Sequence, residues 1–152
     1  MHRRSTALVM AIAGVFFFVI FISQDLSHDT GVEVSELPWG LLARYAVAMT
    51  LGGAFSGLLF AGLFGRHGLF GWILALVGGV FAVLLSGLFG SAFGLLPDLL
   101  ADGFHTADLI ATAVGIFVVP LTLFEQPYLL IVLVALVALS HVLSRRSRQT
   151  AA

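Results

Sequence analysis

Glu125 is the side chain with the greatest potential for chemistry, because it stands in the middle of a long apolar region. Together with Gln126 and Pro127 it separates the two largely apolar halves of the region 107–144. A carboxylate held at depth in a bilayer is costly, and such a residue usually marks an ion or proton site. Pro127 would free backbone carbonyls beside it, as in the interrupted helices of transporters. The alternative is a surface turn in which the proline opens the next helix.

Arg44 is the second candidate for an ion or proton site. It lies just inside an apolar segment that follows an acidic stretch. Its simpler role is that of an interfacial anchor whose guanidinium reaches back to the membrane surface. The sharper alternative is a buried ion pair with Glu33 or Glu36 of the acidic stretch.

The remaining polar residues form no recognisable catalytic or metal-ligating set. The chain has no cysteine, which removes disulfides, thiolate metal sites and thiol catalysis. Its five histidines are scattered, without a pair spaced by four residues, so we expect neither haem nor a metal. The acidic group formed by Asp98, Asp102, His105 and Asp108 matches no dedicated cation site. No phosphate-binding loop or hydrolase motif occurs, so we predict no enzymatic activity and no cofactor.

The composition indicates a membrane protein. Of the 152 residues, 60% are hydrophobic and 10% are charged, and the mean hydropathy is +1.10. Water-soluble domains contain about 25% charged residues. A formal net charge of −1 gives no reason to expect a nucleic-acid partner. The length suits one membrane domain, and a composition without Lys or Asn indicates a GC-rich, bacterial genome.

Five apolar segments predict an all-α, polytopic transmembrane helical bundle. The segments are residues 5–23, 41–64, 69–96, 107–124 and 128–144. A crossing helix needs about 20 residues. The first segment follows a basic start and lacks a small-x-small cleavage site, so we expect an uncleaved span, with a secretory signal as the alternative. The acidic stretches 24–40 and 97–108 contain no Lys or Arg and are expected to be non-cytoplasmic loops.

The number of crossings depends on how residues 107–144 traverse the bilayer. Five crossings would place Arg3, Arg4 and Arg66 inside and the three arginines of the tail outside, which removes the charge bias. An even number places all six on the cytoplasmic side, and we favour it for that reason. It requires residues 107–127 to dip into the bilayer and return, or to form a broken helix buried against the bundle. Five crossings stay possible, because the segment is apolar enough to span.

Small residues in the segments 41–64 and 69–96 predict a tightly packed central hairpin. Small residues at a four-residue step lie on one helix face and let two backbones approach closely in lipid. The expected helix-packing residues are Gly53, Gly57, Ala61, Gly65, Gly71, Ala75, Gly79, Ala82, Ser86, Gly90 and Gly94.

Two functions fit these features. The preferred one is an accessory or assembly subunit of a larger complex in the bacterial inner membrane, with a cytoplasmic N-terminus. Its partners would be the lipid bilayer and either other integral membrane subunits or further copies of the chain. The alternative is a small homo-oligomeric transporter or channel that uses Glu125. A membrane enzyme acting on lipids ranks last, because the sequence contains no catalytic grouping.

Overall fold

The structure is a computed structural model that describes residues 2–28 and 37–149. All regular structure in these residues is helical, which confirms the all-α fold. The α-helices are α1 (His2–His28), α2 (Trp39–Phe60), α3 (Gly68–Asp102), α4 (Thr106–Val114), α5 (Val118–Glu125) and α6 (Leu129–Gln149). Two 3₁₀ turns, η2 (Ala61–Leu63) and η3 (Gly115–Phe117), complete the set. Five segments are long and apolar enough to cross a membrane, as predicted.

Helix α3 is longer than the sequence predicted and continues through Pro97. The expected loop 97–108 is therefore reduced to residues 103–105, between the end of α3 and the start of α4. Proline removes one helical hydrogen bond, a loss that a helix of 35 residues tolerates near its end. Gly103, with a φ of 82°, then ends the helix in a conformation that favours glycine.

Helix α2 packs against both α1 and α3, and it uses different glycines for each. A Cβ atom on Gly52 would lie 2.5 Å from the Gly90 nitrogen of α3. A Cβ atom on Gly57 would lie 2.9 Å from the Ala7 Cα of α1, and one on Gly53 would collide with the Met10 carbonyl. The row predicted for this helix therefore faces α1, whereas the contact with α3 uses the adjacent glycine.

All eleven predicted helix-packing residues are buried, but the row on α3 meets several partners. Gly90 and Gly94 face α2, where added Cβ atoms would collide with Met49 and Tyr45. Gly79 faces Val137 of α6. Gly71 lies against the carbonyl of Arg66, in the connection that precedes α3. The row thus serves a bundle of helices and not a single hairpin.

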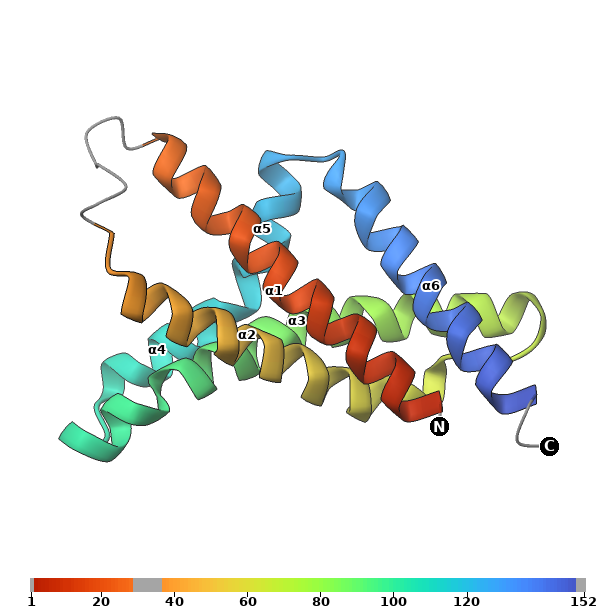
Figure 1. Ribbon diagram of the computed structural model, residues 1–152, viewed down its shortest axis with the longest axis horizontal. Helices are drawn as coiled ribbons and strands as arrows, with labels where there is room; N and C mark the ends of the chain where they lie inside the picture. Colours follow the sequence, from red (N-terminus) through yellow and green to blue (C-terminus); the bar gives the residue numbers. More distant parts are fainter. Residues whose placement is uncertain (1, 29–36, 150–152) are drawn as a thin grey trace.

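Both ends of the described chain lie at the same end of the bundle (Figure 1). Thr6 Oγ1 of α1 and Ser144 Oγ of α6 lie 2.8 Å apart in a buried hydrogen bond. The connection between α2 and α3 lies at the same end, because a Cβ atom on Gly65 would lie 2.8 Å from the Arg145 nitrogen of α6. We call this the arginine end, after Arg3, Arg4, Arg66, Arg145, Arg146 and Arg148. The other side of the bundle, where α1 and α3 finish and α2 and α6 begin, is called the distal end; the helices spread apart there, and the end of α3 lies far from the start of α6 (Figure 1).

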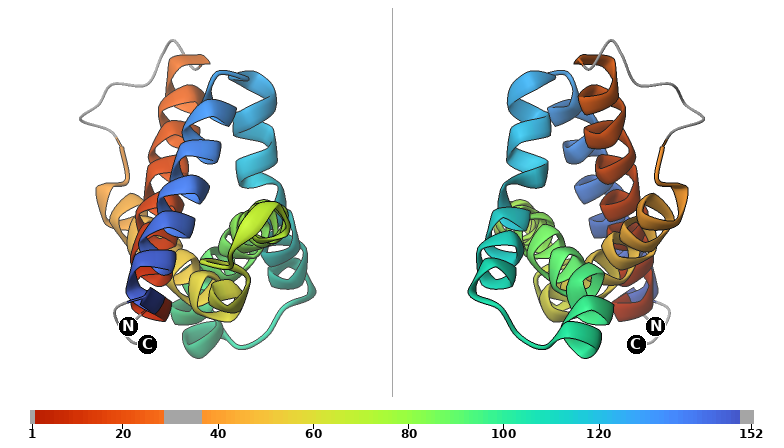
Figure 2. Two further views of the ribbon diagram at one scale, coloured as in Figure 1. Left: turned by 90° about the vertical axis from the view of Figure 1, so that its right-hand side faces the viewer. Right: turned by 90° about the vertical axis from the view of Figure 1, so that its left-hand side faces the viewer.

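Residues 106–125 form a broken helix that leads from the end of α3 to the start of α6. Helix α4 follows the distal end of α3, and α5 leads into the distal start of α6. Between them, Gly115 of η3 packs against Gly87 and Ser91, near the middle of α3. Figure 2 shows α4 and α5 at the edge of the bundle, with the start of α6 beside the top of α5. The helices α1, α2, α3 and α6 and the broken segment 106–125 are each long and apolar enough to cross a membrane, so the even number of crossings stays a prediction.

The buried core lies on the inner side of this broken helix. Val119 of α5 packs there with residues of α1, α3 and α6 and with the end of the α2–α3 connection. The largest apolar side chains of the core include Met10, Phe17, Phe64, Val83, Leu133 and Val137. The core therefore fixes the inner face of the broken segment and leaves its outer face uncovered by the chain.

Cysteine labelling tests the shared position of the two chain ends. The native chain has no cysteine, so single replacements of the exposed residues His67, Gln149 and Phe104 give unambiguous sites. We expect a membrane-impermeant maleimide to modify His67→Cys and Gln149→Cys from one side of the membrane and Phe104→Cys from the other. Modification of His67→Cys and Gln149→Cys from opposite sides would indicate five crossings and contradict the predicted even number.

Candidate functional site

Glu125 is the last residue of α5, and its side chain is exposed at the turn to α6. Gln126 and Pro127 form this turn, and the Gln126 N–H donates to the Thr122 carbonyl at 3.0 Å. Within the described residues, no ion pair or side-chain hydrogen bond joins Glu125 to Arg44 or to any other group. The structure thus places Glu125 at the end of a helix, directly before the turn, and its depth in the membrane stays a prediction.

Arg44 binds Asp98, a partner that the sequence did not suggest. Arg44 Nη1 donates to Asp98 Oδ1 at 2.9 Å, and Nη2 donates to Oδ2 at 2.5 Å. The guanidinium also lies 5.5 Å from the centre of the Tyr45 ring, within cation–π range. The pair joins the distal ends of α2 and α3, and both side chains are partly exposed. The proposed partners Glu33 and Glu36 lie outside the described residues.

Trp39 and Tyr45, two aromatic residues near the start of α2, have different environments. Trp39 is exposed at the start of α2, as a belt residue would be. Tyr45 instead packs inside the bundle, where it stacks on Phe18 of α1 and lies against Gly94 of α3. Arg44 is therefore held by its neighbours on α2 and α3, in addition to its position near the membrane surface.

Reversing both charges of the Arg44–Asp98 pair tests its contribution to folding. We expect Arg44→Asp and Asp98→Arg each to destabilise the bundle, because each places two like charges within contact distance. The double reversal restores the attraction and should recover most of the loss. Reversible unfolding of the four proteins in a double-mutant cycle measures this coupling. Simple addition of the two losses in the double variant would show that the pair contributes nothing.

Among the other acidic residues of the distal end, Asp108 caps a helix. The His105 N–H donates to Asp108 Oδ2 at 2.9 Å, which caps the start of α4. Asp102 ends α3, four residues beyond the ion-paired Asp98. In the part of the chain that the structure describes, no three His, Asp or Glu side chains gather into a possible metal site.

A cluster of buried polar groups, missed by the sequence analysis, lies at the arginine end. Its members come from the start of α1, the α2–α3 connection and the end of α6: Thr6, Gly65, Ser140, His141 and Ser144. The hydroxyls of Thr6 and Ser144 bond to each other, and the side chains in the cluster are at most 1% exposed. The spacing of Ser140 and Ser144 by four residues on α6 is the signal that could have indicated this face.

His141 is the central residue of this cluster. Its Nδ1 atom accepts a hydrogen bond from the Gly65 N–H at 3.2 Å, so the neutral ring carries its proton on Nε2. The ring lies on Trp72 of α3, with 4.5 Å between the ring centres. His141 therefore fastens α6 to the connection between α2 and α3 and to the first turn of α3.

Replacing His141 should loosen the arginine end. In His141→Leu the buried Gly65 N–H loses its acceptor, and we expect a loss of about 1–3 kcal/mol in the free energy of unfolding. In His141→Asn the side-chain oxygen can take the place of Nδ1, so the loss should be smaller. Reversible unfolding in mixed micelles measures both variants. Equal stability of His141→Leu and the wild-type protein would contradict the role given to this hydrogen bond.

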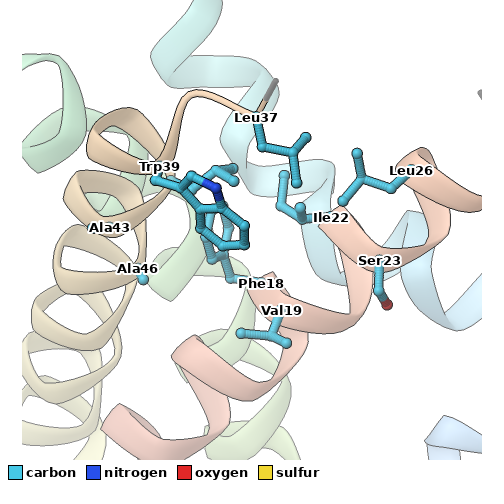
Figure 3. A pocket seen from close by; sticks show the side chains of 10 residues that line it. Phe18, Val19, Ile22, Ser23, Leu26, Leu37, Trp39, Ala43 and Ala46 are labelled. Carbon is cyan, nitrogen blue, oxygen red and sulfur yellow. The ribbon is translucent and has the colours of Figure 1, made fainter. Parts of the chain in front are cut away.

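An apolar groove of about 360 Å³ lies at the distal end between α1 and α2. Figure 3 shows Ile22, Leu26, Leu37 and Trp39 lining it from the two sides. Its one hydroxyl, Ser23 Oγ, donates to the Ile20 carbonyl of its own helix at 2.8 Å. Among the described residues, the groove offers mainly apolar surface, and its side-chain polar groups are the Ser23 hydroxyl and the Trp39 indole N–H.

The groove, the ion pair and the buried polar cluster are separate from one another. The first two lie at the distal end on either side of α2, and the third lies at the arginine end. No family model, curated protein or solved structure matches the chain. The function is therefore inferred from the side chains and surfaces of the molecule itself.

Proposed function

We propose that the protein is a small integral protein of the bacterial inner membrane, acts as an accessory or assembly subunit of a larger membrane complex, and catalyses no reaction. The observation that supports this proposal is the broken helix 106–125. It is apolar enough to enter the membrane, yet it is interrupted at η3 and is the least buried of the five apolar segments.

The outer face of the broken helix is poorly suited to contact with lipid alone. Helix α4 has no buried residue, and Ile110 and Phe117 are 63% and 56% exposed. Pro120, just after the interruption, has no N–H to donate to the helix. Irregular backbone at membrane depth is tolerated where protein covers it. Gly87 and Ser91 cover the inner side of η3, and we propose that a helix of a partner subunit covers the outer side.

The hydrogen bonds and ion pair made by the polar side chains favour an accessory subunit over a transporter. Ser56, Thr50 and Thr122 donate to carbonyls of their own helices at 2.7–2.8 Å. Such bonds are the ordinary way to satisfy hydroxyls inside a bundle. Glu125 ends a helix in an exposed turn, and Arg44 is bound by Asp98. A transport pathway would need polar groups that are free to bind a passing ion or solute.

The distribution of arginines supports a cytoplasmic position for both described chain ends. The arginine end holds six of the seven arginines, whereas Asp98, Asp102, Asp108 and Glu125 lie toward the distal end. Positive side chains collect on the cytoplasmic side of bacterial inner-membrane proteins. The orientation with the arginine end in the cytoplasm satisfies this rule.

Native mass spectrometry of the tagged protein, extracted with a mild detergent from its own host, tests the proposed function. We expect the chain to appear with other integral subunits in fixed stoichiometry. The double variant Ile110→Ala/Phe117→Ala, altered on the outer face, should lose these subunits. The control Leu51→Ala, at an exposed site on α2, should keep them. Isolation of the wild-type chain alone, or as a symmetric oligomer, would overturn the proposal.

A further inference from the structure

Two arginines converge on a single carbonyl oxygen at the arginine end. Arg66 Nε donates to the Gly62 oxygen at 3.2 Å, and Arg148 Nη2 donates to the same oxygen at 3.4 Å. Arg66 belongs to the α2–α3 connection, and Arg148 lies near the end of α6. The fold thus brings two positive charges from distant parts of the sequence into contact with one neutral acceptor.

The charge of this arginine pair is not balanced by a carboxylate of the described chain. The carboxylates whose side chains are described lie between Asp98 and Glu125, toward the distal end. The backbone of Arg145 lies beside Gly65, so a third arginine belongs to the same end of the bundle. The carbonyl groups that end α2 and η2 attract cations, but each contributes only part of a charge. An anion between Arg66 and Arg148 would remove the repulsion between the two guanidinium groups.

The arginine pair also retains donors that could bind such an anion. A guanidinium has five N–H donors in a planar fork, which matches the oxygens of a phosphate group. The bonds to the Gly62 oxygen use one donor group of each arginine. Arg148 Nε is buried and has no hydrogen-bond partner among the described residues.

Apolar side chains beside the pair indicate where the anion comes from. Leu69 and Phe70 follow Arg66 within four residues, and they are 84% and 68% exposed. They begin α3, a helix long and apolar enough to cross a membrane. The arginines therefore lie at the boundary between the apolar surface of this helix and its polar end. A ligand with a phosphate group and long acyl chains matches both parts of this surface.

We propose that Arg66 and Arg148 bind the phosphate of an anionic phospholipid whose acyl chains lie against Leu69 and Phe70. The phosphate bridges the α2–α3 connection and the end of α6, the same two elements that the His141–Gly65 hydrogen bond joins. Bound lipid therefore stabilises the arginine end. This site is separate from the outer face of the broken helix and does not depend on a partner subunit.

Thermal unfolding of the purified protein with added lipids tests this site. We expect phosphatidylglycerol to raise the melting temperature, and phosphatidylcholine with the same acyl chains or inorganic phosphate at equal concentration to leave it nearly unchanged. In Arg66→Gln/Arg148→Gln the apparent affinity for phosphatidylglycerol should fall about tenfold or more, because both phosphate contacts are lost. The control Arg3→Gln/Arg4→Gln removes the same charge from the same end and should keep the affinity.

Native mass spectrometry of the same samples counts the phosphatidylglycerol molecules retained on the folded protein. If Arg66→Gln/Arg148→Gln fails to fold, Arg66→Lys/Arg148→Lys keeps the charge without the planar fork, and it should bind phosphatidylglycerol more weakly than the wild-type protein does. An equal loss of affinity in the Arg3/Arg4 control would show general attraction to the charged end and overturn the proposal. Equal stabilisation by inorganic phosphate would show a site for a free anion and would also overturn it.

Discussion

The Gly52→Val protein is expected to lose much of its stability, whereas Gly40→Val on the same helix is expected to keep it. A Cβ atom on Gly52 would lie 2.5 Å from the Ser86 oxygen and the Gly90 nitrogen, which are backbone atoms of α3. Backbone atoms cannot rotate away, so the two helices must separate. Overpacking in a core costs about 1–3 kcal/mol, and we expect a loss at the upper end of that range or beyond it. Gly40 has no neighbour within 4 Å of an added Cβ atom.

Reversible unfolding in mixed micelles, followed by circular dichroism, measures both proteins. The comparison controls for the change in residue type, because both positions lie in α2 and receive the same side chain. Dispersion contacts replace the hydrophobic effect as the force between helices in lipid, so separating α2 from α3 removes most of what holds them together. Equal stability of the two variants would show that α2 and α3 do not touch at Gly52.

Gly87→Ala should release the broken helix while the rest of the bundle stays folded. An added Cβ atom on Gly87 would collide with the Gly115 carbonyl oxygen of η3, and η3 is the point where the broken helix enters the bundle. We expect Thr122 of α5, fully buried in the native protein, to become accessible. In the background Thr122→Cys, reaction with a small thiol reagent should become about tenfold faster or more, as expected when a segment opens locally.

The matched control for Gly87→Ala adds bulk at an exposed position of the same helix. Ala101→Val lies near the distal end of α3 and should leave the thiol protected. Circular dichroism should show that Gly87→Ala retains nearly all of its helix, because α1, α2, α3 and α6 do not depend on η3. An unchanged rate at Thr122→Cys in the Gly87→Ala protein would contradict the observed contact between α3 and η3.

The sequence correctly predicted which small residues are buried, but it did not predict which helices they contact. Gly53 and Gly57 lie on a face of α2 that the hairpin interpretation assigned to α3, but they pack on α1. Gly52 begins a second small face on the same helix, about 100° away from Gly53. A helix with small residues on two adjacent faces can receive a neighbour on either, and residue spacing alone does not distinguish them.

The sequence indicated Arg44 as a candidate functional residue but did not indicate Asp98 as its ion-pair partner. The sequence placed Asp98 in the expected acidic loop 97–108, whereas α3 continues to Asp102. The α2–α3 connection also includes the 3₁₀ turn η2, which shifts the register of the two helices. To identify Asp98 as the partner of Arg44, one would have needed the positions of a helix end and a turn, which sequence patterns locate poorly.

The arginine count predicted the broken helix better than the lengths of the apolar segments did. Five segments are long enough to cross, and their lengths alone favour five crossings. The bias of arginines toward one side favoured an even number and a broken helix in residues 107–127. The structure has the broken helix, with the break at Gly115–Phe117, and the even number of crossings stays a prediction. The buried cluster around His141 escaped notice, because it joins elements far apart in the sequence.

Site-specific photo-crosslinking in the native host tests the central claim, that the outer face of the broken helix binds a partner subunit. A photoreactive side chain replaces Phe117 in one protein and, as the control, Val47 on the exposed face of α2 in another. We expect the Phe117 probe to give one discrete adduct with another integral membrane protein, and the Val47 probe to give adducts with lipid. Adducts with lipid alone from both positions, or adducts between copies of the chain from Phe117, would contradict the claim.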